Sequence, residues 1–315
     1  MEEQSRSSWP YLASATAAVV FGFSFLFTKA ALDSLDMFQL LGSRFLVAAL
    51  FLSALKRTKV IKVEITSHKL RGLLVVALFQ PILYFIFETV GVDLTSASES
   101  GIVIALIPVV VAALSAWILK EQLTVGQWLS ILLSVLGVIL LTLPRLEGDS
   151  RQMAGILALL GAVIAGALYQ IFSKKASAKS SPVEVTYIMM WVGSIFFNSI
   201  GIWQSARAGQ LSQYVSPLLS SDTIPAILYL GLLSSVGAFF CMNYALLHLT
   251  PSKSAVFINL TPVVSVLAGV FFRGENLAPV QLLGAVVVLL GVWGVGAGGG
   301  GTGGGGRPRM RNSSN

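Results

Sequence analysis

Residues 98–138 read SESGIVIALIPVVVAALSAWILKEQLTVGQWLSILLSVLGV, and residues 252–292 read SKSAVFINLTPVVSVLAGVFFRGENLAPVQLLGAVVVLLGV. A shift of 154 residues aligns the two stretches, with fourteen of 41 positions identical. Shared apolar composition explains matched Leu and Val residues, but it does not explain matched polar residues, Pro and Gly. The matches of that kind are Ser98 with Ser252, Pro108 with Pro262, Glu121 with Glu275, Gln127 with Gln281 and Gly137 with Gly291. The chain therefore contains an internal repeat, which has to be recognised before any motif is interpreted.

The composition is that of a membrane protein. Hydrophobic residues make up 55% of the 315 residues and charged residues 11%, whereas about 25% of an ordinary soluble domain is charged. The apolar residues fall in runs of roughly 18 to 22, which as helices cross a hydrocarbon core of about 30 Å. We predict an all-α integral membrane fold with ten transmembrane helices. They span approximately residues 11–32, 37–55, 71–92, 97–119, 125–143, 153–173, 184–203, 223–246, 252–272 and 278–296.

The repeat divides the chain into two halves of five predicted helices each. We expect a cytoplasmic leader at residues 1–10, a first repeat at 11–146, a second repeat at 147–296 and a flexible tail rich in Gly and Arg at 297–315. A weaker echo pairs Phe27-Thr28-Lys29 with Phe172-Ser173-Lys174, at the ends of the first and sixth spans. Because five is an odd number of crossings, the second half enters the membrane from the opposite side. Inverted-topology repeats of this kind are typical of transporters that work by alternating access.

The basic residues favour one orientation. If the N-terminus is cytoplasmic, fifteen Lys and Arg residues fall in inside segments and four in outside loops. By the positive-inside rule, both termini are predicted to lie in the cytoplasm. The same distribution accounts for the net charge of +7 without a nucleic-acid partner. The expected partner is the lipid bilayer, and the Arg residues of the tail can rest against anionic headgroups.

The duplicated pattern resembles a known family. Each copy has a Ser-rich helix start, a mid-helix Pro, a Glu in a short loop, and then Gln and Gly. The loops read Lys120-Glu121-Gln122-Leu123 and Gly274-Glu275-Asn276-Leu277, and Ser43-Arg44-Phe45 and Asn243-Tyr244-Ala245-Leu246 also fit. Over residues 10–296 this pattern is similar to that of the ten-helix, EamA-type members of the drug/metabolite transporter superfamily. Two stretches depart from it: Gly91-Val92-Asp93-Leu94 replaces Asn/Tyr-Ala-Leu, and Phe21-Gly22 replaces Trp-Gly.

The resemblance implies a class of function. It implies export or exchange of amino acids, related metabolites or drug-like compounds, so we expect a secondary transporter of small molecules. A bacterial plasma membrane is the location that it implies. The departures leave the substrate open, and neither the direction of flux nor proton coupling follows from the sequence.

Two charged residues lie inside predicted spans, where charge is costly and needs an explanation. Arg44 is in the second span and Glu88 in the third, both in the predicted outer half of the bilayer. They either pair with each other or face a shared polar cavity. Gln80, Tyr84 and Glu88 recur every four residues, so they share one helix face, which should meet protein or water. Glu88 also permits proton coupling.

Three prolines mark predicted hinges. Pro81 directly follows Gln80, and it is able to kink the third helix and free a backbone carbonyl near the membrane midplane, where transporters often bind substrate. Pro108 and Pro262 hold equivalent positions in the fourth and ninth spans.

Polar residues of the second half complete the predicted cavity. Ser234 falls at the repeat-equivalent level of Gln80, and Asn259 lies one turn before Pro262. Hydrogen-bonding and aromatic groups of this kind suit a small amphipathic metabolite, and packing is the alternative role of each. The predicted cavity residues are Arg44, Gln80, Tyr84, Glu88, Tyr169, Gln170, Ser234, Asn243, Tyr244 and Asn259.

Glu121 and Glu275 are repeat-related acids in short loops on opposite membrane faces. Each precedes a span, and we expect its carboxylate to cap the N-terminus of that helix; gating one end of the cavity is the alternative.

Glycines in the last spans of the repeats let helix backbones approach closely, which indicates either tight packing or a homodimer interface. They are Gly126, Gly137, Gly284, Gly291 and Gly294.

Other classes of function lack their markers. The sequence has no HExxH or GxSxG motif and no intramembrane Asp or His to partner a Ser, so we predict no enzymatic activity. Cys241 is the single cysteine, and His68 and His248 are far apart in the sequence, so no metal site is expected. The glycine-rich tail lacks the Lys-Ser/Thr of a phosphate-binding loop, and no cofactor is expected. A channel-like facilitator and a membrane scaffold or receptor without coupled transport are the alternatives to a carrier.

Overall fold

A computed structural model describes residues 8–119, 124–142, 150–209, 211, 214–221, 223–249 and 260–298, and all the regular structure of these residues is helical. By length and composition, seven helical segments of these residues are able to cross a membrane. Three shorter apolar helices, Val125–Leu141, Leu260–Arg273 and Pro279–Gly294, coincide with the remaining predicted spans. The predicted all-α membrane fold is therefore confirmed. Residues 1–7, the tail from residue 299, Glu121 and Asn259 lie outside the described residues.

Five spans make up each half of the chain. The first half contains α1 (Trp9–Leu32), α2 (Met37–Arg57), the third span as α3 (Ser67–Ala77), η1 (Leu78–Leu83) and α4 (Tyr84–Leu94), the fourth span as α5 (Ala97–Ile104) and α6 (Ile107–Leu119), and α7 (Val125–Thr142). The second half contains α8 (Ser150–Ala176), α9 (Pro182–Arg207), the eighth span as α10 (Ile224–Leu228), η5 (Tyr229–Ala238) and α11 (Phe239–His248), α13 (Leu260–Arg273) and α14 (Pro279–Gly298). A short 3-10 helix, η4 (Ser216–Leu219), precedes α10.

Local sequence signals begin several of these helices. Ser96 and Ser181 each cap a helix whose third residue is Glu, and the two residues of each pair bond each other's backbone N–H. Pro182 follows Ser181 at the first helical position, where its missing N–H costs nothing. A reciprocal capping box of this kind satisfies two backbone donors that the helix itself leaves free.

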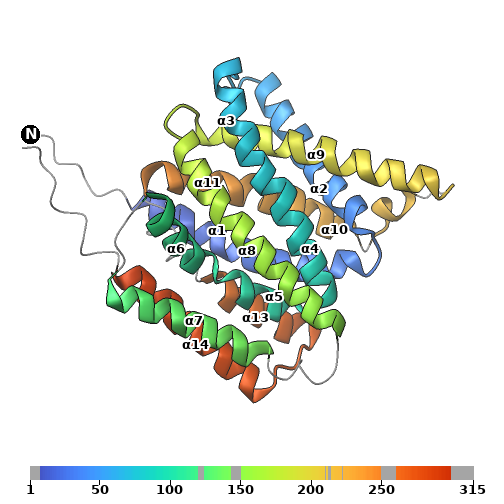
Figure 1. Ribbon diagram of the computed structural model, residues 1–315. Coiled ribbons are helices and arrows are strands. Elements are labelled where there is room, and N and C mark those ends of the chain that lie inside the picture. The colour runs from blue at the N-terminus through green and yellow to red at the C-terminus, as the bar shows by residue number, and fades with distance from the viewer. Residues whose placement is uncertain are drawn as a thin grey trace, which may run out of the picture.

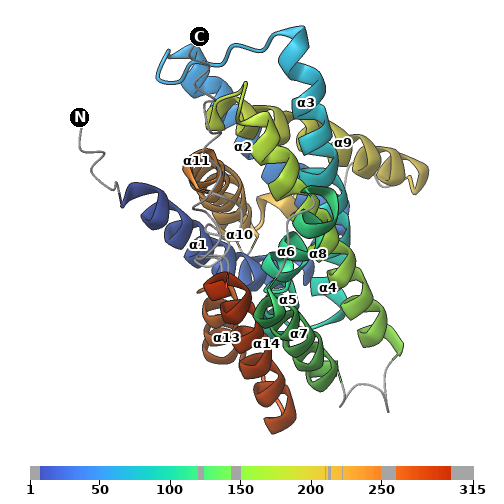
Figure 2. The ribbon, with the colours of Figure 1, turned by 60° about the vertical axis from the view of Figure 1, so that its left-hand side comes forward.

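The two halves exchange neighbours in a symmetric way (Figures 1 and 2). The first helix of each half packs on the third and fourth spans of the other half, α1 on η5, α11 and α13, and α8 on α4, α5 and α6. Equivalent helices also pair directly, α2 with α9 and α7 with α14. This arrangement is the one that an internal pseudo-two-fold relation produces, and it puts the first, third and fourth spans of both halves at the centre.

A matching pair of lysines ties the ends of these central helices together. Lys29 at the end of α1 donates to the carbonyls of Val92 and Asp93, at 2.9 and 2.6 Å. Lys174 at the end of α8 donates to the carbonyls of Leu246 and Leu247, at 2.8 and 3.2 Å. The acceptors are 154 residues apart, as the repeat requires, and a cation at a helix C-terminus satisfies its last carbonyls and complements its dipole.

Small residues join α7 and α14 at close range. The two helices run antiparallel, because Gly137 lies against Val288 while Gly294, further along α14, lies against Ser130, earlier on α7. Gly284 and Gly291 face α7 as well. Four of the five glycines singled out in the sequence thus face the other helix of the same chain, while a Cβ at Gly126 would meet only Thr124 Oγ1, at 3.9 Å, among the described residues.

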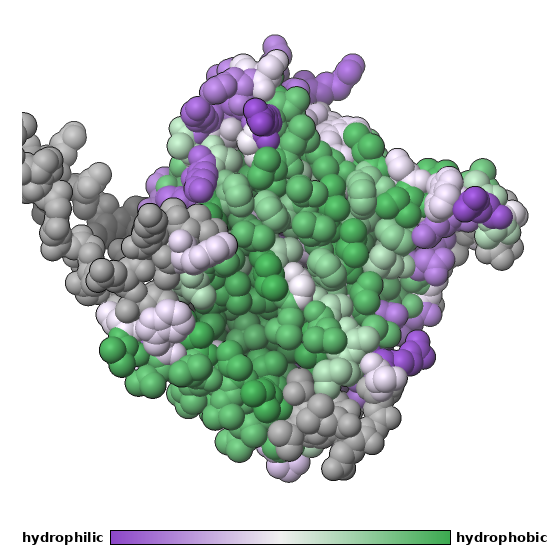
Figure 3. Space-filling view, viewed as in Figure 1, coloured by the Kyte–Doolittle hydropathy of each residue, from purple (hydrophilic) through white to green (hydrophobic). Residues whose placement is uncertain are grey.

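The outer surface is apolar over a wide area. Figure 3 shows hydrophobic side chains covering the middle of one face, with hydrophilic ones gathered toward its edges. Exposed large residues such as Leu129, Leu132, Leu136 and Trp293 belong to α7 and α14. A contiguous apolar surface of this extent is rare on a soluble monomer and fits contact with lipid.

We expect Gly137→Ala to destabilise the protein. The new Cβ would lie 2.6 Å from the backbone nitrogen of Val288, so α7 and α14 would have to separate. Overpacking of this kind costs about 1–3 kcal/mol, measurable as a lower melting temperature of the purified protein. Gly126→Ala on the same helix is the control, since the nearest atom would lie 3.9 Å away. Equal melting temperatures for the two variants would contradict this account of the pair.

Candidate functional site

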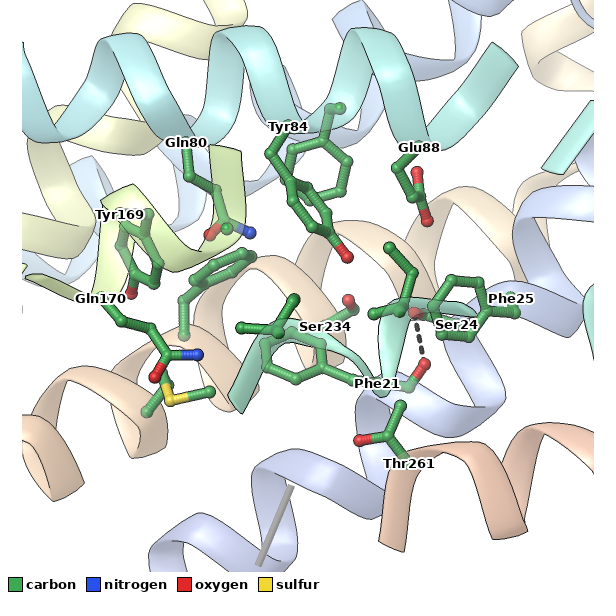
Figure 4. A pocket seen from close by; sticks show the side chains of 16 residues that line it. Phe21, Ser24, Phe25, Gln80, Tyr84, Glu88, Tyr169, Gln170, Ser234 and Thr261 are labelled. Carbon is green, nitrogen blue, oxygen red and sulfur yellow. Dashed lines mark hydrogen bonds between the residues drawn. The ribbon is translucent and has the colours of Figure 1, made fainter. Parts of the chain in front are cut away.

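A cavity of about 50 Å³ lies between the central helices of the two halves (Figure 4). The first half lines it from α1, the third span and the fourth span, and the second half from α8, the eighth span and α13. The lining residues are Phe21, Ser24, Phe25, Gln80, Tyr84, Phe85, Glu88, Ile104, Ile107, Gly166, Tyr169, Gln170, Ser234, Phe239, Met242 and Thr261.

The lining follows the internal repeat residue by residue. The shift of 154 residues pairs Gln80 with Ser234, Phe85 with Phe239, Glu88 with Met242 and Ile107 with Thr261. The shift of 145 residues, taken from the Lys29 and Lys174 echo, pairs Phe21 with Gly166, Ser24 with Tyr169 and Phe25 with Gln170. These seven pairs supply fourteen of the 16 lining residues. The cavity therefore sits on the pseudo-two-fold axis, but the paired residues differ in chemistry at most positions.

The third span presents the predicted polar stripe. Gln80, Tyr84 and Glu88 all line the cavity and extend from the same side of their segment toward it. The helix is interrupted at Gln80, whose φ of −148° and ψ of 116° are extended, and the peptide bond to Pro81 is cis. Pro81 has no N–H to continue the helical hydrogen bonds. The predicted hinge position thus coincides with the break that turns Gln80 into the cavity.

The other two predicted hinge prolines also lie at the ends of helical segments. The fourth span is interrupted at residues 105–106, just before Pro108, whose missing N–H leaves the carbonyl of Ile104 without its helical donor. Pro262 lies two residues after the start of α13 and next to the lining residue Thr261.

Arg44 is buried but does not line the cavity. Its side chain is 1% exposed, and it donates from Nε to Ser235 Oγ and from Nη2 to Ser234 Oγ, both at 3.2 Å. The guanidinium carbon lies 4.5 Å from the ring centroid of Phe85. Among the described residues, no ion pair joins Arg44 to Glu88. The two charges attract each other only at longer range.

Glu88 is therefore a buried acid without a salt bridge in the described part of the chain. Its side chain is 2% exposed, and Oε2 accepts a hydrogen bond of 3.2 Å from Thr89 Oγ1. Figure 4 shows its carboxylate directed into the cavity, at the end opposite to Tyr169 and Gln170. The repeat puts Met242 at the equivalent position of the second half, so the acid has no counterpart.

The polar residues of the second half divide into lining and supporting groups. Tyr169, Gln170 and Ser234 line the cavity, and Oε1 of Gln170 is buried without a hydrogen-bond partner among the described residues. Asn243 is fully buried behind the lining and accepts from Tyr169 Oη at 2.9 Å. It also accepts from Ser173 at 2.8 Å and donates to Thr186 at 3.1 Å. Asn243 thus fixes the Tyr169 hydroxyl by joining α8, α9 and α11.

Tyr244 lies away from the cavity lining. Its ring is stacked on Phe240, with centroids 6.3 Å apart, and its carbonyl oxygen lies 2.9 Å from Nδ1 of His248. Asn259 lies outside the described residues.

Glu275 caps a helix, but a different one from the helix predicted. Its Oε1 accepts from the backbone N–H of Ala97 at 2.9 Å, and its Oε2 accepts from the backbone N–H of Ser98 at 2.9 Å and from Ser98 Oγ at 2.5 Å. The carboxylate therefore holds the N-terminus of α5, in the other half of the chain. The expectation that it caps its own following helix, α14, is wrong, because packing of α13 on α5 brings the first turn of α5 closer.

Sequence reasoning missed several lining residues. Ser24, Thr261 and the rings of Phe21, Phe85 and Phe239 all border the cavity, though none of them is charged or part of a recurring polar pattern. One signal was available, because Thr261 aligns with Ile107, and Phe239 with Phe85, in the repeat. These two positions could have been found by applying the repeat alignment to every residue of the first, third and fourth spans of each half, beyond the matched polar residues, Pro and Gly.

Comparisons with known proteins agree with this architecture. The family model described as the EamA-like transporter family matches residues 8–143 and again residues 153–297. This double match confirms the resemblance found in the repeat. A solved crystal structure covers 91% of this chain and 96% of its own, with a TM-score of 0.65. At 17% sequence identity, that similarity shows the fold alone.

Several relatives match this chain over more than two thirds of their own length. An uncharacterized transporter of Bacillus subtilis (strain 168), YcxC, is 32% identical over 301 residues, which is 95% of this chain and 96% of the relative. Another from that organism, YetK, is 26% identical over 90% of this chain and 85% of its own. An uncharacterized transporter of Archaeoglobus fulgidus is 28% identical over 67% of this chain and 71% of its own. The chain belongs to the EamA-like transporter family, and it is a multi-pass membrane transporter.

Proposed function

We propose that the protein carries small organic molecules across a plasma membrane by alternating access, as an exporter or exchanger, with both termini in the cytoplasm. The supporting observation is the cavity on the repeat axis, to which each half contributes equivalent positions. Because the halves are inverted copies, the movement that opens the cavity to one side has a counterpart that opens it to the other. The orientation rests on the distribution of Lys and Arg.

The size of the cavity supports a cycle with moving helices. A volume of about 50 Å³ holds a few water molecules, each of which needs about 10–15 Å³ by this measure. A metabolite is larger, so the helices around the cavity have to separate before it binds. Two sets of hydrogen bonds would have to break on the side where α4 ends. Glu275 accepts from the backbone N–H groups of Ala97 and Ser98, and Lys29 donates to two carbonyls of α4.

Flux through purified protein in proteoliposomes tests this function. We would load labelled amines, amino acids and neutral metabolites and measure efflux, uptake and counterflow, with and without a pH gradient. A carrier gives saturable flux that unlabelled substrate on the other side accelerates, while a channel gives flux without counterflow. Flux that a pH gradient drives in the unmodified chain, and that persists in Glu88→Gln without responding to the gradient, would assign proton coupling to this carboxylate. Absence of flux in folded protein for the whole panel would favour the scaffold.

A series at Gly166 tests whether this cavity is the route. A Cβ at Gly166 would lie 2.9 Å from Ile107 Cδ1 and 3.3 Å from the Tyr84 ring, inside the lining. We expect Gly166→Ala to lower the flux and Gly166→Val to lower it further, at least tenfold. The melting temperature of both variants should stay within a few degrees of that of the unmodified chain. Gly72→Val is the matched control, because no atom of another described residue lies within 4 Å of its Cβ position, chain neighbours and the backbone of its own helix aside. Unchanged flux in Gly166→Val would exclude the cavity as the route.

Glu275→Gln tests closure on the side where α4 ends. The substitution removes the charge that holds three donors of α5, and hydrogen bonds to a charged group contribute about 1.5–3 kcal/mol each. With Cys241 replaced by Ala and a reporter cysteine at Ser24, we expect faster labelling by an external, membrane-impermeant maleimide. Asp33→Asn is the control, since its ion pair with Arg273 is exposed and contributes little. Equal labelling rates in both variants would remove Glu275 from the closing contacts.

A further inference from the structure

Three of the five hydroxyl groups that line the cavity, those of Ser24, Thr261 and Tyr169, donate their hydrogens to protein oxygens. Ser24 Oγ donates to the carbonyl of Phe21 at 2.7 Å, and Thr261 Oγ1 donates to the carbonyl of Ala18 at 3.1 Å. Tyr169 Oη donates to Asn243 Oδ1 at 2.9 Å. A hydroxyl has a single hydrogen to give, so each of these oxygens offers only lone pairs to a molecule in the cavity.

Glu88 adds the strongest acceptor. Its Oε2 receives one hydrogen bond, from Thr89, and in the described part of the chain Oε1 receives none. A buried carboxylate in a membrane protein is stabilised by positive charge and by hydrogen-bond donors that face it, or it takes up a proton. In the described lining no cation lies next to Glu88, and Arg44 attracts it only at longer range, so an ammonium group in the cavity would give this carboxylate its closest cationic partner.

Arg44 does not fill this role, although it is near. Its donors are engaged by Ser234 and Ser235, and its guanidinium lies against Phe85. No Lys, Arg or His belongs to the lining that the described residues form. A ligand carboxylate would therefore meet only neutral donors in this lining, such as the Tyr84 hydroxyl and the Gln170 amide, while a ligand ammonium would meet the Glu88 carboxylate.

The middle of the cavity is aromatic. Phe21 and Phe239 meet edge to face with centroids 5.1 Å apart, and Phe85 and Phe239 do so at 6.1 Å. Such rings take up an apolar group and attract a neighbouring cation. At the far end from Glu88, Figure 4 shows Tyr169 and Gln170, whose amide is able to donate or accept.

We propose that this cavity recognises amphipathic amines that lack a carboxylate, in preference to amino acids. The ammonium group donates to Glu88, Ser24 and Thr261, and the apolar body lies along Phe21, Phe85 and Phe239. The inference rests on the proposed function, since it names the substrate class of that same site.

Equilibrium binding tests the inference separately from transport. The full chain, purified in lipid nanodiscs, would be titrated by calorimetry with three matched probes: 2-phenylethylamine, L-phenylalanine and 3-phenylpropionate. They share an aromatic body and differ in having an ammonium, both charges or a carboxylate. We expect the amine to bind at least tenfold more tightly than the other two.

Substitutions locate the binding group. Glu88→Gln should weaken amine binding at least tenfold, and Ser24→Ala, which removes one acceptor, should weaken it by several-fold with normal folding. Glu64→Gln makes the same change in net charge at an exposed position and should bind the amine as the unmodified chain does. Melting temperatures identify any variant that fails to fold, in which case Ser24→Ala decides.

Several results would overturn the inference: no binding of the amine, equal or tighter binding of phenylalanine or phenylpropionate, or full affinity in folded Glu88→Gln and Ser24→Ala. The proposed function fails in a different way. Amine binding with no flux of any probe would refute transport and support the inference. Saturable flux of amino acids without amine binding would support transport and refute the inference.

Discussion

In a membrane, a chain must satisfy its own backbone hydrogen bonds, and it can leave the regular α-helix only where protein or a polar cavity surrounds it. Three interruptions of the central helices obey this constraint. Gln80 is extended within the third span, residues 105–106 break the fourth, and the π-helical segment η5 contains Ser234. Each interruption contributes or adjoins lining residues. The irregular backbone and the cavity therefore occur together. The cavity and the surrounding protein keep the irregular backbone away from lipid, and the irregular backbone helps to form the lining.

Buried charge is handled in two ways around that cavity. Arg44 is surrounded by two hydroxyls and two aromatic rings, which hold its guanidinium in place, and no carboxylate of the described residues pairs with it. Glu88 faces the cavity with a single hydroxyl donor. The charges cancel over a longer distance, so neither is an isolated charge in a low-dielectric interior. The acid nevertheless keeps oxygens free for a ligand, which a direct salt bridge would have occupied.

Much of this could be predicted from the sequence, for physical reasons. The ten spans follow from hydrocarbon thickness and helix rise, and the stripe of Gln80, Tyr84 and Glu88 follows from helical periodicity. The partners of Arg44 and Glu275 could not be predicted, because they lie 190 and 177 residues away and depend on which helices pack together. Periodicity gives the face of a helix, but it does not say which helix meets that face. Only the repeat carries information of that kind, and it also contains Ser24 and Thr261.

The pairing of Glu88 with Met242 gives the cavity a direction. A half-turn about the repeat axis brings the Met242 thioether to the place of the Glu88 carboxylate. A bound molecule therefore has one preferred orientation in the cavity rather than two equivalent ones. In the proposed alternating-access cycle, the molecule keeps this orientation while the helices move around it. When the molecule moves toward the side where α4 ends, the group bound by Glu88 then leads. When it moves the other way, that group trails. If the protein exchanges its substrates as proposed, the two directions are therefore different paths for the ligand, even through a scaffold whose halves are copies of each other.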